Sequence, residues 1–117
     1  MKTPNEVYDE ALTAIGAVGA GQTASAEDTL VASTVFRPLL EELAAIDVIY
    51  IAVDPTDDDA QDIPEEVFLP LSKLLANEIA PHFGAPYDTG IRELMLQRLR
   101  RLTHSPSYGQ TQQAEYY

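Results

Sequence analysis

Residues 64–84, PEEVFLPLSKLLANEIAPHFG, decide the fold of this 117-residue chain. Glu65 and Glu66 fall in the first turn of an expected helix, where carboxylates interact favourably with the helix dipole. Pro81 and Gly84 are residue types that end helices. The apolar side chains between them recur at helical spacing: Val67, Phe68, Leu71, Leu74, Leu75 and Ile79. A helix with so strong an apolar face needs neighbours to cover it.

A first neighbour is expected near the N-terminus. Thr3 can cap this helix, Pro4 suits its first position, and Glu6 completes a capping box. Gly19 and Gly21 are expected to end it. Its apolar stripe consists of Val7, Ala11, Ala14, Ile15 and Val18.

A second neighbour is expected from Ser25, the predicted N-cap, to about Ile46. The side chains that should face the core are Leu30, Phe36, Leu39, Leu40 and Leu43. Pro38 removes a backbone donor and clashes with the preceding turn. We therefore expect a kink, or a break into two helices, just before it.

A last helix is expected from about Asp88 to His104. Ile91, Leu94, Met95, Leu99 and Leu102 should face inward, and Arg92, Arg98, Arg100 and Arg101 outward. The predicted fold class is therefore all-α, a small four-helix bundle formed by residues 1–104. An extended tail, residues 105–117, follows it.

A longer arm, residues 47–62, joins the second and third helices. Its first part, residues 47–53 (DVIYIAV), is rich in β-branched residues, which favour extended structure. No second strong strand exists in the chain, so this part either extends the preceding helix or is a strand or loop that pairs elsewhere. The remainder, residues 54–62 (DPTDDDAQD), is an acidic turn segment.

Carboxylates of the arm stand at ligand positions of a calcium-binding loop: Asp54, Asp58, Asp62 and Glu65. Asp59, however, occupies the position where the sharp turn of such a loop needs glycine, and Thr56 stands at its third position. We expect a solvated acidic loop and no metal site.

The net charge of −12 is divided unevenly along the chain. Residues 1–66 carry 15 acidic residues and two basic ones, whereas residues 67–117 carry four acidic and five basic ones. This balance disfavours direct binding of nucleic-acid phosphates and favours head-to-tail contact between copies. The chain has no cysteine and no apolar run of the roughly 18 residues that a membrane helix needs. We expect a protein made and used in the cytosol or in an assembly built there.

Catalytic constellations are not evident. His82 and His104 have no Ser, Cys or carboxylate at a spacing typical of a triad or metal site. Glycines at positions 16, 19 and 21 lack the strand and the Lys-Ser/Thr of a phosphate-binding loop. We expect no enzyme activity and no cofactor.

The order of these parts resembles a known family. A short helix, a Gly-rich stop and a longer helix occupy residues 11–43 (ALTAIGAVGAGQTASAEDTLVASTVFRPLLEEL). A Pro-Glu-Glu start, an apolar helix and an A-P-x-x-G stop follow in residues 62–86, and residues 91–102 (IRELMLQRLRRL) form the closing helix. In this order the chain resembles the head-to-tail connector (adaptor) proteins of tailed bacteriophages, of the small helical type that attaches beneath the portal ring.

The resemblance implies a structural protein of the virion, located at the head–tail interface and assembled in the host cytoplasm. Such proteins form rings, commonly of about twelve copies with heterologous contacts. The ring binds the portal protein, extends the DNA channel and offers a platform to tail or nozzle proteins, while DNA passes through without specific binding. The part that docks on the portal would be the tail: Ser105, Pro106, Tyr108, Gln110, Gln112, Tyr116 and Tyr117.

Two further sets of residues receive roles in this hypothesis. An acidic channel wall would repel DNA phosphates, and the arm offers Asp54, Asp57, Asp58, Asp59 and Asp62 for it. Contact between neighbouring copies would use the arginines of the last helix: Arg98, Arg100 and Arg101.

The tail itself agrees with docking. Residues 105–117 hold three of the six tyrosines and a single charge, which favours ordering on a partner over simple disorder. The alternative is a small acidic regulator, or a nucleic-acid mimic that binds a host or phage protein. Such a protein would bind its target as a monomer or dimer with the tail dispensable.

Overall fold

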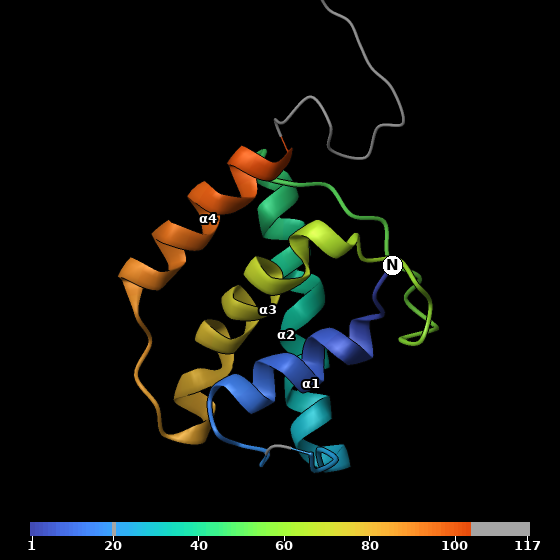
Figure 1. Cartoon of the computed structure of the whole chain (residues 1–117), viewed down its shortest axis with the longest axis vertical. Coiled ribbons are helices and arrows are strands. Elements are labelled where there is room, and N and C mark those ends of the chain that lie inside the picture. The colour runs from blue at the N-terminus through green and yellow to red at the C-terminus, as the bar shows by residue number, and fades with distance from the viewer. Residues whose placement is uncertain (20, 104–117) are drawn as a thin grey trace, which may run out of the picture.

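Figure 1 shows a computed structural model of the chain, which describes residues 1–19 and 21–103. These residues form four α-helices and a short 3-10 helix: α1 (Pro4–Ala14), α2 (Ala26–Ala45), α3 (Glu65–Ile79), η1 (Ala80–Phe83) and α4 (Thr89–Thr103). Within these residues there is no β-strand, and only one isolated antiparallel bridge joins Lys2 to Ile63. The predicted all-α class is confirmed.

Helix α3 lies at the centre of the molecule. It packs against α1 and α2 on one side and against α4 on the other (Figure 1). Among the described helices α4 packs closely against α3 alone, and it reaches α2 only through the side chain of Arg92. The predicted apolar face of α3 is confirmed, apart from the half-buried Phe68. Its buried residues are Val67, Pro70, Leu71, Ser72, Leu74, Leu75, Ala76, Asn77 and Ile79.

The starts of the helices agree with the sequence. The Thr3 hydroxyl accepts from the Glu6 amide at 3.1 Å, and the Glu6 carboxylate accepts from the Thr3 amide at 2.9 Å, which completes the predicted capping box. Ser25 caps α2 by accepting from the Asp28 amide at 3.1 Å. Asp88 caps α4, since its carboxylate accepts from the backbone amides at positions 90 and 91.

The end of α1 differs from the prediction. The helix stops at Ala14, before Gly19 and Gly21, because Gly16 adopts φ +78° and ends it earlier. The Gly16 amide donates to the Thr13 carbonyl at 3.1 Å, and the next amide donates to the carbonyl of residue 12 at 3.0 Å. This pair of bonds is a Schellman motif, which satisfies carbonyls that the helix end leaves free.

The same motif ends α2, but with an aspartate in place of glycine. Asp47 has φ +61°, and its amide donates to the Ala44 carbonyl at 3.1 Å. The Val48 amide donates to the Leu43 carbonyl at 2.9 Å. Both Leu43 and Val48 are buried, which supplies the apolar contact that accompanies this motif.

Three side chains predicted to face the core lie on the surface instead: Leu30, Ile91 and Leu94. Leu30 is 65% exposed, Leu94 57% and Ile91 38%, whereas Leu96, which was not among the side chains predicted to face inward, is buried. At 100° per residue, Leu94 lies on the side of α4 opposite Leu99 and Leu96. Because α4 packs on α3 alone, it buries only a narrow stripe. Leu30 is likewise turned away from the stripe that α2 buries, which contains Phe36 and Leu43.

Of the two predictions for Pro38, a kink or a break, the break is not observed, since α2 is a single helix from Ala26 to Ala45 that contains Pro38. The chain after it, residues 48–53, is neither helix nor strand, so the interpretation as a loop holds among the alternatives for this part of the arm. Val48 and Ile49 are buried there, and Tyr50 is exposed.

The two Schellman motifs offer a matched pair of substitutions. Asp47→Gly should stabilise the protein by about 0.5–1 kcal/mol, because glycine adopts positive φ without steric cost and removes a negative charge from a helix C-terminus. Gly16→Ala should destabilise it by about 1 kcal/mol. Apart from Gly16 itself and its two chain neighbours, no described heavy atom lies within 4 Å of the position of an added Cβ, so this loss would come from the backbone alone. Urea unfolding measures both, and shifts of the same sign would contradict the assignment.

Candidate interaction surfaces

The acidic loop, residues 54–62, folds back onto the body of the protein. Arg37 of α2 donates through Nη2 to the Pro55 carbonyl at 3.0 Å and pairs with Asp58 Oδ1 at 3.3 Å. Asn5, at the start of α1, donates its backbone amide to the Asp58 carbonyl at 3.0 Å and its side-chain amide to Asp59 Oδ1 at 2.7 Å. The loop is thus fixed to two helices.

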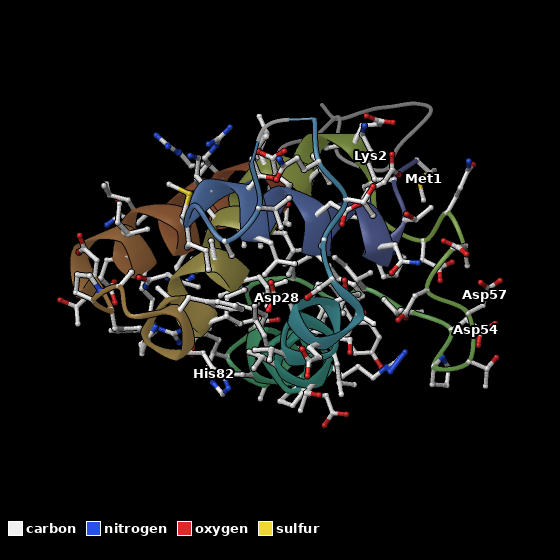
Figure 2. All side chains as sticks on the ribbon, turned by 90° about the horizontal axis from the view of Figure 1, so that it is seen from below. Met1, Lys2, Asp28, Asp54, Asp57 and His82 are labelled. Atoms are coloured by element: carbon white, nitrogen blue, oxygen red, sulfur yellow. The ribbon has the colours of Figure 1, made fainter. Side chains whose placement is uncertain are left out.

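Other carboxylates of the loop fold it upon itself. Asp54 Oδ1 accepts from the Thr56 amide at 2.9 Å and from its hydroxyl at 2.7 Å, and these bonds hold the pKa of Asp54 below its ordinary value. Asp57 Oδ1 accepts from the amide two residues on at 2.9 Å, and Asp62 Oδ2 accepts from the Asp54 amide at 3.1 Å. Figure 2 shows Asp54 and Asp57 at the edge of the molecule on this loop.

The five predicted channel residues are therefore brought into one loop, but they serve as its hydrogen-bond acceptors. Asp54, Asp57 and Asp59 are exposed, and Asp58 and Asp62 are half-buried. Nowhere in residues 1–19 and 21–103 do three carboxylate or imidazole groups lie together so that they could hold a metal ion.

A buried tyrosine, which no sequence pattern singled out, lies under the loop. Tyr8 is fully buried and meets the ring of Phe36 edge-on, with centroids 5.5 Å apart. Its hydroxyl has no hydrogen-bond partner of acceptable geometry among the described residues, although the Asp58 carboxylate is near. Burial raises the pKa of Tyr8 well above its ordinary value, and the negative charge of Asp58 adds to this, while Arg37 opposes it.

Arg92 was expected to point outward, and this prediction is wrong. Its side chain is 18% exposed and lies between α2, α3 and α4. Nη2 pairs with Glu42 at 2.6 Å, and Nη1 pairs with Glu78 at 3.4 Å. Burial acts to lower the pKa of Arg92, but the Glu42 carboxylate, with smaller contributions from Tyr87 and Glu78, outweighs it and raises the pKa. The guanidinium thus joins three helices.

One side of α4 combines aliphatic side chains with two of the remaining arginines, and we call it the outer face of α4. It consists of Ile91, Leu94, Arg98 and Arg101, which share one side of the helix at spacings of three and four. Ile91, Leu94 and Arg101 are exposed, and Arg98 is half-exposed. Arg100 is also exposed, but its side chain is offset from Arg101 by about 100° around the helix. None of the three arginines forms an ion pair with a described residue.

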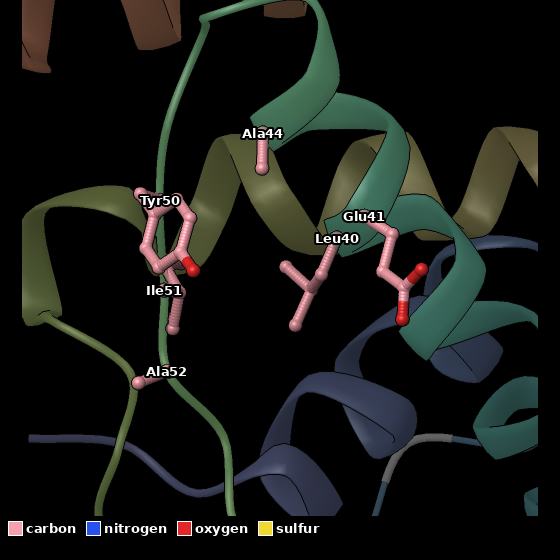
Figure 3. A pocket seen from close by; sticks show the side chains of 6 residues that line it. All are labelled: Leu40, Glu41, Ala44, Tyr50, Ile51 and Ala52. Carbon is pink, nitrogen blue, oxygen red and sulfur yellow. The ribbon is translucent and has the colours of Figure 1, made fainter.

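A second surface lies where residues 48–53 pass beside α2 (Figure 3). A hollow of about 170 Å³ there is lined by Leu40, Glu41, Ala44, Tyr50, Ile51 and Ala52. Tyr50 is 84% exposed. At the start of this segment, the Thr103 hydroxyl donates to the Val48 carbonyl at 3.1 Å and so ties the end of α4 to it.

The predicted portal-docking residues lie outside the described residues, and so does His104. They are Ser105, Pro106, Tyr108, Gln110, Gln112, Tyr116 and Tyr117. In the part of the chain that the structure does describe, no helix combines the length and the apolar character needed to cross a membrane.

Comparison with known proteins identified no relative of this chain. No protein-family model, no curated protein and no solved structure matches the chain.

Tyr8→Phe should stabilise the protein by about 1 kcal/mol, because it removes a buried hydroxyl that lacks a partner. The raised pKa of Tyr8 also means that the folded state resists ionisation of this group. The stability that results from this raised pKa is complete below the unfolded-state pKa of about 10, and it is lost as the pH rises toward the folded-state pKa. Above about pH 10, Tyr8→Phe should therefore lose less stability than the unaltered protein.

Chemical unfolding at pH 7 and pH 11 measures both effects. Tyr50→Phe is the matched control, because its exposed hydroxyl should change stability by less than about 0.5 kcal/mol. A clear loss of stability in Tyr8→Phe would instead demonstrate a hydrogen bond to Asp58.

Arg92→Ala should destabilise the protein by about 1–2 kcal/mol, because it leaves Glu42 and Glu78 without their partner. Arg100→Ala, which removes the same charge from an exposed position, should change stability by less than about 0.5 kcal/mol. Urea unfolding at low salt provides the comparison. Equal effects of the two substitutions would show that Arg92 ties no helices together.

Proposed function

We propose that this protein is a head-to-tail adaptor of a tailed bacteriophage, with a structural and not a catalytic role. Its body is a small four-helix bundle with an acidic arm between α2 and α3, and its tail follows α4. Copies form a ring under the portal protein, extend the DNA channel and provide the attachment platform for tail or nozzle proteins.

The outer face of α4 carries this proposal. A helix that packs against one neighbour leaves its opposite side free, and this side bears two exposed aliphatic side chains beside two arginines, Arg98 and Arg101. Apolar groups rimmed by charge are typical of protein contact surfaces. Residues 1–66 carry 15 acidic residues against two basic ones, so the opposing partner surface can be another copy of the same chain.

Ring formation demands two different faces on each copy, because its contacts are heterologous. The outer face of α4 supplies the basic one. Exposed carboxylates of α1 and α2 that form no ion pair with described residues supply acidic candidates: Asp9, Glu10, Glu27 and Glu41. Contacts of this kind are screened by salt.

The acidic loop supports a role beside DNA. Because Arg37 and Asn5 hold the loop against α2 and α1, its carboxylates keep fixed positions. A rigid acidic rim repels phosphates and lets DNA slide without binding. The tail, residues 105–117, is the segment proposed to dock on the portal, with its tyrosines as anchors.

Charge reversal on α4 tests the assembly. The double variant Arg98→Glu/Arg101→Glu should weaken ring formation on purified portal rings at least about tenfold, because it places like charges across the contact. Arg100→Glu is the matched control, since it lies off the outer face and should assemble much like the unaltered protein. Sedimentation of the mixed complexes, with electron microscopy of the rings, provides the readout.

Unaltered assembly of the double variant would remove the role of this face. A different result would favour the alternative function over the adaptor. A monomeric complex with a nucleic-acid-binding protein, formed equally well without residues 105–117, would identify the chain as an acidic regulator or nucleic-acid mimic.

A further inference from the structure

A hollow of about 400 Å³ lies between the end of α1, the second half of α3 and the start of α4. Small side chains make up much of its wall: Ala14 of α1, Ala76 of α3 and Ala80 of η1. Ala76 and Ala80 are almost fully buried, so the floor of the hollow belongs to the body of the protein. Its size and apolar wall are typical of a site that accepts an apolar group.

Asn77 fixes one side of this hollow. It is almost fully buried, and its side chain donates to the Asp88 carbonyl at 2.9 Å and accepts from the Asp88 amide at 2.8 Å. The Asp88 carboxylate in turn caps α4. These bonds tie the chain before α4 to α3, so the hollow is formed before any partner binds, which lowers the cost of binding.

Lys73 gives the hollow a positive charge at its rim. This residue is exposed and forms no ion pair within the described part of the chain. Asp88, the other charged residue of the lining, already accepts from two backbone amides of α4. The hollow therefore suits an apolar group with a negative charge beside it.

Helix α2 bears such a group on its surface at Leu30, which is 65% exposed. Glu27 lies one turn before Leu30 on the same side of the helix, is exposed, and forms an ion pair with no described residue. One turn after Leu30, the hydroxyls of Ser33 and Thr34 donate to the Leu30 carbonyl at 3.0 and 2.8 Å, so their hydrogens are satisfied within the helix. We call these four residues the Leu30 patch.

We infer that the hollow of one copy of this chain receives the Leu30 patch of a second copy. Leu30 enters the hollow as its apolar group, and Glu27 pairs with Lys73 at the rim. A helix that places an apolar side chain in a groove is a recurring form of protein recognition. The inference rests on the proposed assembly of copies and names two surfaces that meet in it.

The Leu30 patch and the hollow belong to different elements. The patch lies on α2 alone, whereas the hollow is lined by α1, α3, η1, α4 and the chain that leads to α4. Each copy can therefore offer its patch to one neighbour and its hollow to another, which is the heterologous contact that a ring requires. Ile91 lines the hollow and also belongs to the outer face of α4, so this contact would continue onto that face.

Charge exchange tests the contact on the purified full chain, without portal protein. Lys73→Glu and Glu27→Lys each place like charges in the contact and should each weaken association at least about tenfold. An equimolar mixture of the two variants should associate again, because every hollow in it can then meet a patch of opposite charge. Sedimentation velocity at up to about 1 mM protein provides the readout, since this concentration populates even contacts with a millimolar Kd.

Two further variants separate the contact from general effects of charge. Glu93→Lys makes the same change of charge at an exposed position of α4 outside the hollow and the outer face. It should associate like the unaltered chain and should not restore Lys73→Glu in a mixture. Leu30→Ala keeps both charges and should weaken association at least about tenfold, because it removes the apolar group. Circular dichroism checks that the helices persist in all variants.

Three outcomes would overturn the inference: an unaltered chain that stays monomeric up to this concentration, single variants that associate undiminished, and a mixture that stays dissociated. Failure of the adaptor proposal gives a different result. A chain that passes the charge exchange but does not bind portal rings would keep this contact and lose the adaptor function. A chain that assembles on portal rings but fails the charge exchange would keep the adaptor function and lose this contact.

Discussion

Burial of α3 on two opposite sides is the constraint on which the other elements depend. A fully buried leucine, isoleucine or valine contributes roughly 1.5–3 kcal/mol relative to the exposed side chain, and α3 buries Val67, Leu71, Leu74, Leu75 and Ile79 almost completely. A helix of 11 residues such as α1 is marginal in isolation, and most helical stability in proteins comes from packing of an apolar face, so α1 and α2 depend on this contact for their stability. Because α1 and α2 pack on one side of α3 and α4 packs on the other, α4 packs closely against no other described helix, and its outer face is exposed among the described residues.

In this acidic molecule, a few basic residues form the ion pairs that hold the elements together. Arg37 fixes the acidic loop to α2, and Arg92 ties α4 to α2 and α3. Arg98 and Arg101 pair with none of the described residues, although acidic residues outnumber basic ones strongly. A small protein that uses some arginines for internal ties and leaves others on a partly apolar surface is suited to contact with an acidic neighbour. Some arginines thus stabilise the body of the protein, and the others are available for its proposed contact with neighbouring copies in a ring.

Sequence reasoning succeeded where a feature depends on neighbours within about four residues. Thr3, Ser25 and the apolar face of α3 behave as predicted, since capping bonds and helical periodicity are local. It failed where the outcome depends on which helices meet. Periodicity could not tell which of Leu94 and Leu96 is covered, because that depends on which side of α4 packs against α3. For the candidate site, the sequence analysis identified the five aspartates of the loop. It did not predict that they accept hydrogen bonds from other groups of the same protein. One signal for Arg37 was present: it is one of only two basic residues in residues 1–66.

The sequence by itself determined the all-α class, the starts of the helices and the acidic character of the loop, because propensity, capping and charge are written in short stretches. Only the tertiary structure decided that the loop folds back to Asn5 and Arg37, that Arg92 is buried between carboxylates, and that residues 49–53 lie extended without a partner among the described residues. These features join residues up to 54 positions apart along the chain, as in the contact of Asn5 with Asp59. Their geometry follows from helix packing, which no local pattern encodes.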